Sequence, residues 1–403
     1  MAIDLSNIMF SDQNDIIPLS GIEEIVNTGI ANSLGGNDVI TGNSEWEPGF
    51  LNTGTFNTDD GNDIVTGTGN YGILNSSNAT LGTGQGNDTI TGIGYLGILN
   101  GGRVDTGNGE DSIISQGTFN NRGEVFLGNN NDLLTANVDS LTGAYGIENS
   151  RIIDTGDGND TITTTGGSIV NSNFMNTGGG NDIITSTSFI SNYQGGVIET
   201  GNGADSIISH GSLSNGGGVF LGEGNDSITA DTDGLTGHTF VNSNAIETGE
   251  GHDIITITGS IYNEGIINTG NGDDSIVVNA TGREYDHIYN TGGAINMGNG
   301  NDSIIANKGF RSGPNSSGAW FLGEGNDYIK GFGSGDFYGG KGKDTLELTP
   351  GTYTVGIWGE AGESPIFTKG DQLMITSEFE KLKAGSTIYD FTSLTAGQII
   401  VVA

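Results

Sequence analysis

The feature that most constrains this chain is a short glycine-aspartate motif, such as TGQGND ending at Asp88, that returns along most of the sequence. Its aspartate, called the anchor, recurs every 17–28 residues, a period typical of solenoids. The anchors are Asp38, Asp63, Asp88, Asp111, Asp132, Asp160, Asp182, Asp205, Asp226, Asp253, Asp274, Asp302, Asp327 and Asp344, with a degenerate earlier one at Asp15. We therefore treat the chain as one stack of related coils.

Two apolar columns keep a fixed distance from the anchors. The residue two positions after every anchor is aliphatic, from Ile17 to Leu346. The residue seven positions before is apolar from Ala31 to Trp320. Side chains of a strand alternate between its two faces, so these columns predict two short strands that face each other across a narrow core.

A third column, eleven to thirteen residues before the anchor, is asparagine: Asn27, Asn52, Asn75, Asn100, Asn120, Asn149, Asn171, Asn192, Asn215, Asn242, Asn263, Asn290 and Asn315. Stacked amides can bond one coil to the next, so we interpret this column as a structural ladder. The arc from asparagine to anchor has a nearly constant length, whereas the arc after the anchor varies. Insertions after Asp132, Asp226 and Asp274 are therefore expected to form loops on one side of the coils.

The motif itself indicates calcium. Eleven anchors complete G-x-G-x-D, and those at Asp38, Asp63 and Asp132 depart from it. Alternating glycines allow positive φ angles and direct carbonyls into one concavity, where the aspartate adds a charged oxygen. Hard oxygen donors without His or Cys favour calcium over zinc or copper. One loop offers too few ligands for calcium, so adjacent loops are expected to share each ion, with all fourteen anchors as candidate ligands. Plain metal-free turns are the alternative.

The motif resembles the repeats-in-toxin, or haemolysin-type calcium-binding, family, whose nonapeptide G-G-x-G-x-D-x-aliphatic-x winds into a parallel β-roll with calcium between turns. The resemblance covers roughly residues 30–348. Here one glycine usually follows Thr, Ser, Leu or Met, and each coil carries one motif. This departure favours a larger coil with one row of ions. Fourteen stacked loops leave gaps for up to about 13 Ca²⁺.

Composition limits the classes of partner. The 49 acidic against 12 basic residues give a net charge of −37, which argues against nucleic acid and predicts bound cations. There is no cysteine, so disulfides and thiolate metal sites are excluded. No apolar run approaches the ~20 residues of a membrane span. The start of the sequence lacks the features of a cleaved signal, so export is expected by another route.

The terminal segments do not follow the repeat. Residues 1–26 are expected to form an N-terminal cap with SDQNDII as a worn half-motif, and residues 27–348 the repeats. Residues 349–403 are expected to form a C-terminal β cap, with a helical turn near SEFEKLKAG. The family resemblance implies that this segment also carries a type I secretion signal.

The sequence gives weak support to other functions. Thr41, Thr66, Thr91 and related threonines lie three residues after their anchors and are expected to point outward, a row that could bind ice or carbohydrate or simply favour strands. The four histidines share no register, and the loop TGREYDH is the only place where Arg, Glu, Tyr, Asp and His gather. We therefore expect no enzyme.

The sequence thus predicts an all-β protein, a calcium-stabilised parallel β-solenoid of about fifteen coils with caps at both ends. We expect a secreted or cell-surface structural or adhesive protein, folded by extracellular calcium, as the resemblance implies. Its partners would be calcium ions, and cell-surface polysaccharide or further copies of itself. The alternative is a secreted carbohydrate-active, glycan-binding or ice-binding solenoid that uses the insertion side or the threonine face.

Overall fold

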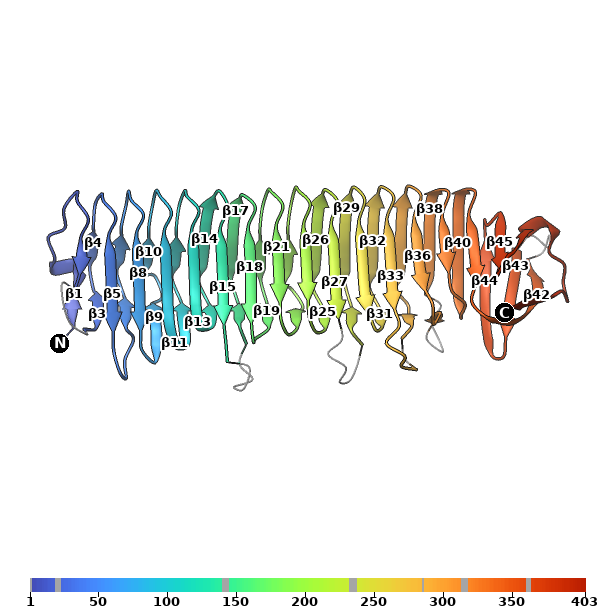
Figure 1. Cartoon of the computed structure of the whole chain (residues 1–403), viewed down its shortest axis with the longest axis horizontal. Helices are drawn as coiled ribbons and strands as arrows, with labels where there is room; N and C mark the ends of the chain where they lie inside the picture. Colours follow the sequence, from blue (N-terminus) through green and yellow to red (C-terminus); the bar gives the residue numbers. More distant parts are fainter. Residues whose placement is uncertain are drawn as a thin grey trace. The chain divides into compact units, whose positions relative to one another are not determined.

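The computed structural model describes residues 2–18, 23–139, 145–231, 238–284, 286–312, 318–359 and 364–403. It consists of two compact units, Met1–His210 and Gly211–Ala403, each of which is a stack of short parallel strands (Figure 1). The predicted parallel β-solenoid is confirmed, with about 13 turns among the described residues where about fifteen coils were predicted. Within the same residues, no helix is long and apolar enough to cross a membrane.

Each coil of the first unit contributes three strand positions, two on face A and one on the opposite face B. The strands after the anchors are β2 (Ile16–Ile17), β5 (Val39–Asn43), β8 (Ile64–Thr68), β11 (Thr89–Asn100), β13 (Ser112–Asn121), β15 (Leu133–Asn137), β18 (Thr161–Thr165), β21 (Ile183–Ser186) and β24 (Ser206–Ser209). The asparagine strands of face A are β1 (Ile3–Asp4), β3 (Ile25–Asn27), β6 (Phe50–Asn52), β9 (Tyr71–Asn75), β16 (Ile147–Asn149), β19 (Ile169–Asn171) and β22 (Ile190–Asn192), while β11 and β13 run through both positions. Face B holds β4 (Ile30–Asn32), β7 (Thr55–Asn57), β10 (Thr80–Gly82), β12 (Arg103–Asp105), β14 (Glu124–Asn129), β17 (Ile152–Asp157), β20 (Phe174–Asn176) and β23 (Val197–Glu199).

The second unit repeats this plan and then ends in a cap. After its anchors lie β27 (Ser227–Asp231), β30 (Ile254–Thr258), β33 (Ser275–Asn279), β36 (Ser303–Ala306), β39 (Tyr328–Lys330) and β41 (Thr345–Leu348). The second position of face A holds β25 (Leu213–Asn215), β28 (Phe240–Asn242), β31 (Ile261–Asn263), β34 (Ile288–Asn290) and β37 (Phe310–Ser312). Face B holds β26 (Gly218–Glu223), β29 (Ala245–Glu250), β32 (Ile266–Asn271), β35 (Ala294–Asn299), β38 (Ala319–Gly325) and β40 (Gly335–Gly342).

The core consists of three buried columns, two of which were predicted. The aliphatic column after the anchors is buried from Ile40 to Leu346, and only Ile17, in the first rung, is half-exposed. The apolar column of face B is buried throughout and includes Phe337 as a further member. The third column, two residues before each ladder asparagine and including Phe50, was not predicted. Each coil therefore closes around three apolar side chains, which is why such short strands suffice.

The anchor turns form an even row along one edge of each unit, whereas the loops along the opposite edge vary in length (Figure 1). This distribution confirms that the length variation lies on one side of the coils. Of the predicted insertion loops, residues 140–144, 232–237 and 285 lie outside the described residues. His238, which follows one of these segments, stacks on Tyr262 with ring centroids 4.8 Å apart.

The asparagine ladder is present in both units. Each amide donates Nδ2–H to the Oδ1 of the next coil's asparagine over 2.8–3.0 Å, from Asn27 to Asn192 and from Asn215 to Asn290. Of the asparagines predicted for this ladder, one was assigned wrongly and one is untested. Asn121 rather than Asn120 belongs to the ladder, because β13 pairs Asn121 with Asn149 and places Asn120, which is also buried, opposite Glu148. Asn315 lies outside the described residues, and Ser312 is the register partner of Asn290.

The caps continue the sheets. Before the first full coil, β1 pairs in parallel with β3 and β2 with β5. A 3₁₀ turn at Leu5–Asn7 follows β1. The C-terminal cap of the second unit consists of β42 (Gly351–Trp358), β43 (Ser364–Lys369), β44 (Gln372–Ser377), β45 (Lys381–Ala384), β46 (Thr387–Asp390) and β47 (Ile399–Val402), with a 3₁₀ turn at Phe391–Ser393. The helical turn expected near SEFEKLKAG is wrong. Leu382 and Ala384 alternate inward with outward lysines, and this period of two forms β45, which pairs with β41.

Candidate metal centre

Glycine is required in the anchor turns because the coils approach closely there. In the turn before Asp88, Gly84 and Gly86 have φ angles of 100° and 127°, which residues other than glycine rarely adopt. A Cβ atom on Gly86 would lie 1.7 Å from the carbonyl oxygen of Gly61 in the preceding coil. Carbonyl oxygens of one turn thus point along the stack at the next turn.

The anchors form a ladder of their own. The backbone N–H of each anchor donates to the Oδ1 of the anchor in the next coil; Asp63, for example, donates to Asp88 over 2.8 Å. In the first unit this series runs from Asp15 to Asp205, and in the second from Asp226 to Asp344, with distances of 2.7–2.9 Å. One carboxylate oxygen of each aspartate is therefore fixed inside the turn.

The second oxygen of these carboxylates is an orphan. For twelve anchors the Oδ2 atom is buried and makes no hydrogen bond within the described structure: Asp38, Asp63, Asp88, Asp111, Asp132, Asp160, Asp182, Asp253, Asp274, Asp302, Asp327 and Asp344. All fourteen anchor side chains are at most 2 % exposed. A buried carboxylate oxygen without a partner is costly, and its repetition in coil after coil points to a ligand of positive charge.

Burial raises the pKa values of the anchor aspartates. It raises the pKa of Asp63, Asp88, Asp111, Asp274 and Asp327 to about 6. Burial raises the pKa further, to about 7 for the anchors at 182 and 302 and to about 8 for the one at 132, where the neighbouring anchor charges add to the effect. Close to neutral pH the row therefore holds its negative charge only against a substantial penalty.

A buried hydroxyl five residues before many anchors was missed by sequence reasoning. Thr83 Oγ1 donates to the carbonyl oxygen of Thr106 in the next coil over 3.2 Å. Leu127 occupies this position before Asp132, whose pKa burial raises to about 8. The recurring TG before the motif was the available signal.

In most coils the side chain just before the anchor points outward and accepts a backbone N–H of the next coil, whereas the anchor's own backbone N–H donates to the next coil. Asn62 Oδ1 accepts the N–H of Asn87 in the next coil over 2.8 Å, and most coils repeat this bond. In one coil His252 replaces the asparagine, and its Nδ1 accepts the N–H of Asp273 over 2.8 Å. The histidine thus supplies the same acceptor, which explains why it is tolerated in the turn.

The donor set fits calcium. Among the described residues, no three or more His, Cys, Asp or Glu side chains group as a metal cluster, so an ion in this row would need main-chain oxygens in addition to the carboxylates. The glycine turns supply such carbonyls, and the anchors supply the orphan Oδ2 atoms. Calcium accepts six to eight oxygen ligands of this mixed kind.

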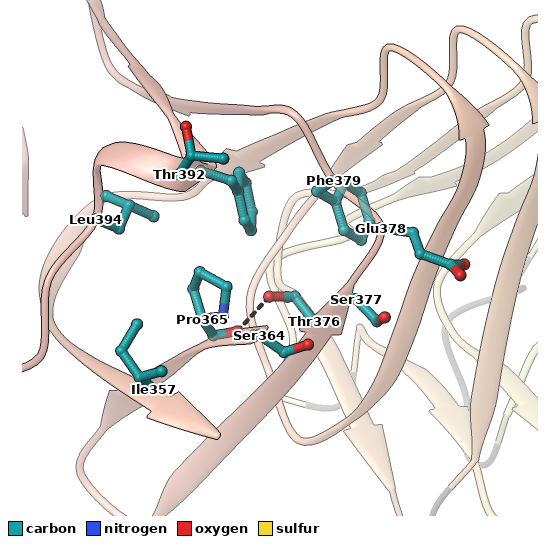
Figure 2. Close-up of a pocket in the computed structure, with 10 residues that line it drawn as sticks. Ile357, Ser364, Pro365, Thr376, Ser377, Glu378, Phe379, Thr392 and Leu394 are labelled. Atoms are coloured by element: carbon teal, nitrogen blue, oxygen red, sulfur yellow. Dashed lines mark hydrogen bonds between the residues drawn. The ribbon is translucent and has the colours of Figure 1, made fainter. Parts of the chain in front are cut away.

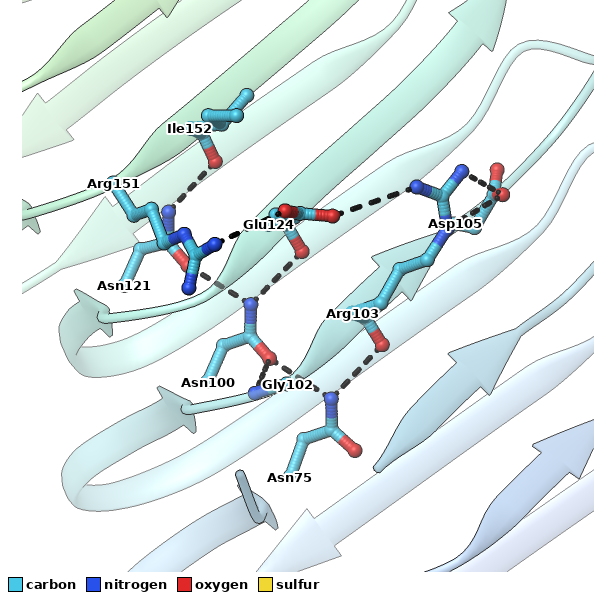
Figure 3. Close-up of polar contacts among 9 residues, drawn as sticks. All are labelled: Asn75, Asn100, Gly102, Arg103, Asp105, Asn121, Glu124, Arg151 and Ile152. Carbon is cyan, nitrogen blue, oxygen red and sulfur yellow. Dashed lines mark hydrogen bonds and ion pairs between the residues drawn. The ribbon is translucent and has the colours of Figure 1, made fainter. Parts of the chain in front are cut away.

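Two groups of charged side chains outside the anchor row are bonded within the fold. The carboxylate of Asp286, in the loop TGREYDH, accepts bonds from Thr281 Oγ1 and from the N–H groups of Gly282 and Arg283, while residue 285 is not described. On face B of the first unit, Arg103 and Arg151 both pair with Glu124, beside the asparagine ladder (Figure 3). These ion pairs link three successive coils.

The C-terminal cap contains a cavity of about 370 Å³ (Figure 2). Its wall is mixed, with apolar surface from Ile357, Pro365 and Phe391 and hydroxyl groups from Thr376 and Thr392. Thr376 Oγ1 donates to the carbonyl oxygen of Pro365 at its rim. That hydroxyl is therefore already bonded within the cap.

Comparison with known proteins gives matches among chains of solved structures but no family. No family model matches the chain, and no curated protein matches it. One matching structure is a hyperactive, Ca²⁺-dependent, β-helical antifreeze protein from an Antarctic bacterium, 24 % identical over 75 % of this chain and 85 % of that chain, with a TM-score of 0.44. Membership of the repeats-in-toxin family therefore stays a prediction.

Proposed function

We propose that this chain is a calcium-binding structural or adhesive protein of the cell exterior, whose solenoid is stabilised by a row of ions along the anchor turns. The observation that carries the proposal is the series of buried anchor carboxylates with an orphan Oδ2 atom. A plain turn needs only the Oδ1 bond to the neighbouring N–H. It gives no reason to bury a second, charged oxygen twelve times.

Charge supports a divalent cation in this row. About 13 Ca²⁺ would reduce the net charge of −37 to about −11. Neighbouring anchors at the strand spacing of about 4.8 Å would repel each other by about 3 kcal/mol at an effective dielectric constant of 20. A shared cation turns this repulsion into attraction, so calcium binding would supply free energy of folding.

The location outside the cell follows from the calcium requirement. Calcium is scarce in the cytosol and abundant outside, so the chain would stay unfolded before export and fold afterwards. The absence of cysteine means that no disulfide competes with calcium as the stabilising device. A non-catalytic role is supported by the fourteen aspartates of the anchor row, whose buried positions are explained by ion binding.

The threonine row supports a second candidate, binding of ice or glycans. Thr41, Thr66 and Thr91 stand in register on β5, β8 and β11, on the outer side of face A. The row breaks at Ile114 and Ile208. Thermal hysteresis or partition into ice would identify an ice-binding protein, and a glycan array would identify a lectin.

Far-UV circular dichroism of the calcium-stripped protein tests the primary proposal. We expect a largely unfolded spectrum in chelator and a β spectrum after millimolar calcium, with magnesium much less effective. A folded spectrum that chelator leaves unchanged would mean that the anchor turns do not need calcium and would contradict the proposal. Detection of the protein by antibody on the surface of intact source cells would test its location separately.

A further inference from the structure

The C-terminal cap ends the anchor row with a glutamate that takes the place of an anchor. In a regular rung, Asp327 N–H donates to Asp344 Oδ1 over 2.9 Å, and Thr345 N–H donates to the carbonyl oxygen of Asp327 over 2.8 Å. At the next rung, Asp344 N–H donates to Glu380 Oε2 over 2.7 Å. Lys381 N–H donates to the carbonyl oxygen of Asp344 over 3.0 Å. Glu380 therefore reproduces both bonds of an anchor.

A glutamate stands there because the cap turn is short. The cap strand β44 pairs with β40, which places Thr376 opposite Phe337, and β45 pairs with β41, which places Glu380 at the level of Asp344. Three residues separate Thr376 from Glu380, whereas six separate Phe337 from Asp344. The glycine turn is thus absent, and the additional methylene of glutamate restores the reach.

Oxygen atoms converge beside this rung. Gly339 stands where other coils carry the buried threonine or an apolar residue, and a Cβ atom built on it would lie 2.0 Å from the carbonyl oxygen of Glu378 and 2.9 Å from Asp344 Oδ2. Asp344 is 0 % exposed, and its Oδ2 is one of the orphan atoms. Glu378, one of the residues that line the cap cavity, adopts a φ angle of 60° (Figure 2).

Three of the neighbouring lysines are engaged elsewhere. Lys330 and Lys383 pair with Glu347, and Lys381 pairs with Asp390. These pairs leave the carboxylates of Asp344 and Glu380 without a charged partner from those side chains, while the Glu380 carboxylate accepts the backbone N–H of Asp344.

We propose that Asp344, Glu380 and the carbonyl oxygen of Glu378 bind a terminal calcium ion, which locks the cap onto the last coil. This inference rests on the proposed function, since it extends the same row by one site. The site joins the repeat to a segment that is remote in sequence from its last motif. Filling it couples calcium to the docking of β44 and β45, so the open end of the sheets is covered only when calcium is present.

Hydrogen exchange of the full-length protein, read by mass spectrometry with and without calcium, tests the inference. In the wild type, calcium should slow exchange at least tenfold in peptides that cover residues 372–384. Glu380→Gln keeps an oxygen that accepts the Asp344 N–H but removes the charge, so it should lose this calcium-dependent slowing. Glu378→Gln is the matched control, because only its main-chain oxygen is involved, and it should behave as the wild type.

The outcomes separate the inference from the proposed function. If calcium protects both the anchor turns of residues 63–182 and residues 372–384 equally in wild type and Glu380→Gln, the terminal site is refuted and the calcium row stands. If calcium protects neither region in the wild type, both ideas fall. Glu380→Asp keeps the charge with a shorter reach and should recover part of the protection. Identical behaviour of this variant and Glu380→Gln would also count against a calcium ligand.

Discussion

Replacing one anchor by its amide should change stability in opposite directions with and without calcium. Asp88 is suitable because its turn has the complete motif and its side chain is 1 % exposed. In Asp88→Asn, the amide oxygen still accepts the N–H of Asp63, so the ladder bond is preserved. The substitution removes only the charge and the orphan oxygen, which a calcium ion would use.

The magnitude follows from the pKa of Asp88, which burial raises from 3.8 to about 6. At pH 8 the ionised carboxylate then costs the calcium-stripped fold about 3 kcal/mol, and we take about 2 after solvent screening at the turn. Asp88→Asn should therefore stabilise the stripped protein by about 1–2 kcal/mol, allowing for its buried NH₂ group. With calcium at 100 times its Kd, loss of one ion should cost about 2.7 kcal/mol.

Urea unfolding at pH 8, in chelator and in saturating calcium, measures both values. If the stripped wild type is already unfolded, the stripped comparison is made in a stabilising osmolyte. Glu110→Gln removes an equal charge from an exposed turn position and serves as the control. Destabilisation of the same size in both conditions would make Asp88 an ordinary turn residue and refute the reasoning.

Three further predictions concern the turns, the ladder and pH. Gly86→Ala should destabilise the protein by about 3 kcal/mol or more in calcium, because its Cβ would lie 1.7 Å from a main-chain oxygen. Gly35→Ala is the control: the nearest atom to its Cβ lies at 3.8 Å, so it should change stability by less than about 0.5 kcal/mol. The midpoints of urea unfolding measure both effects. Asn75→Ala removes the amide that joins two coils and should cost about 2–3 kcal/mol by the same measurement, and an unchanged midpoint would show that the ladder is dispensable. Because the pKa values of buried anchors are raised above 3.8, to about 8 for Asp132, their contribution to the stability of the stripped protein is present at low pH and is lost as pH rises through 6–8. In the stabilising osmolyte, where the stripped protein is folded, it should melt at a higher temperature at pH 5 than at pH 8.5, and a calorimetric scan showing the reverse would contradict the shifts.

Much of the architecture could be predicted because it repeats. A fixed distance from the anchors revealed two of the three apolar columns, and the glycines revealed the tight edge. The third column, which includes Phe50, was overlooked although it stands two residues before each ladder asparagine. The asparagine itself was misassigned at residue 120, because two asparagines are adjacent and the register of β13 with β16 selects the second.

The site could be predicted only where it follows the motif. The anchors were found by their glycines, but their bonds to one another and their orphan oxygens depend on the distance between coils. Glu380 was missed because it lies outside any glycine motif and reaches Asp344 through tertiary pairing of the cap. The helical turn expected around it was wrong because alternating Leu382 and Lys383 suit a strand equally well, and pairing with β41 decides.

A crystal structure grown in calcium, with anomalous diffraction data, tests the central claim most directly. We predict a row of anomalous peaks along the anchor turns, each within about 2.3–2.6 Å of an anchor Oδ2 atom and of turn carbonyl oxygens. A folded solenoid with water or nothing beside these atoms at millimolar calcium would contradict the proposal that the buried aspartates are there to bind ions.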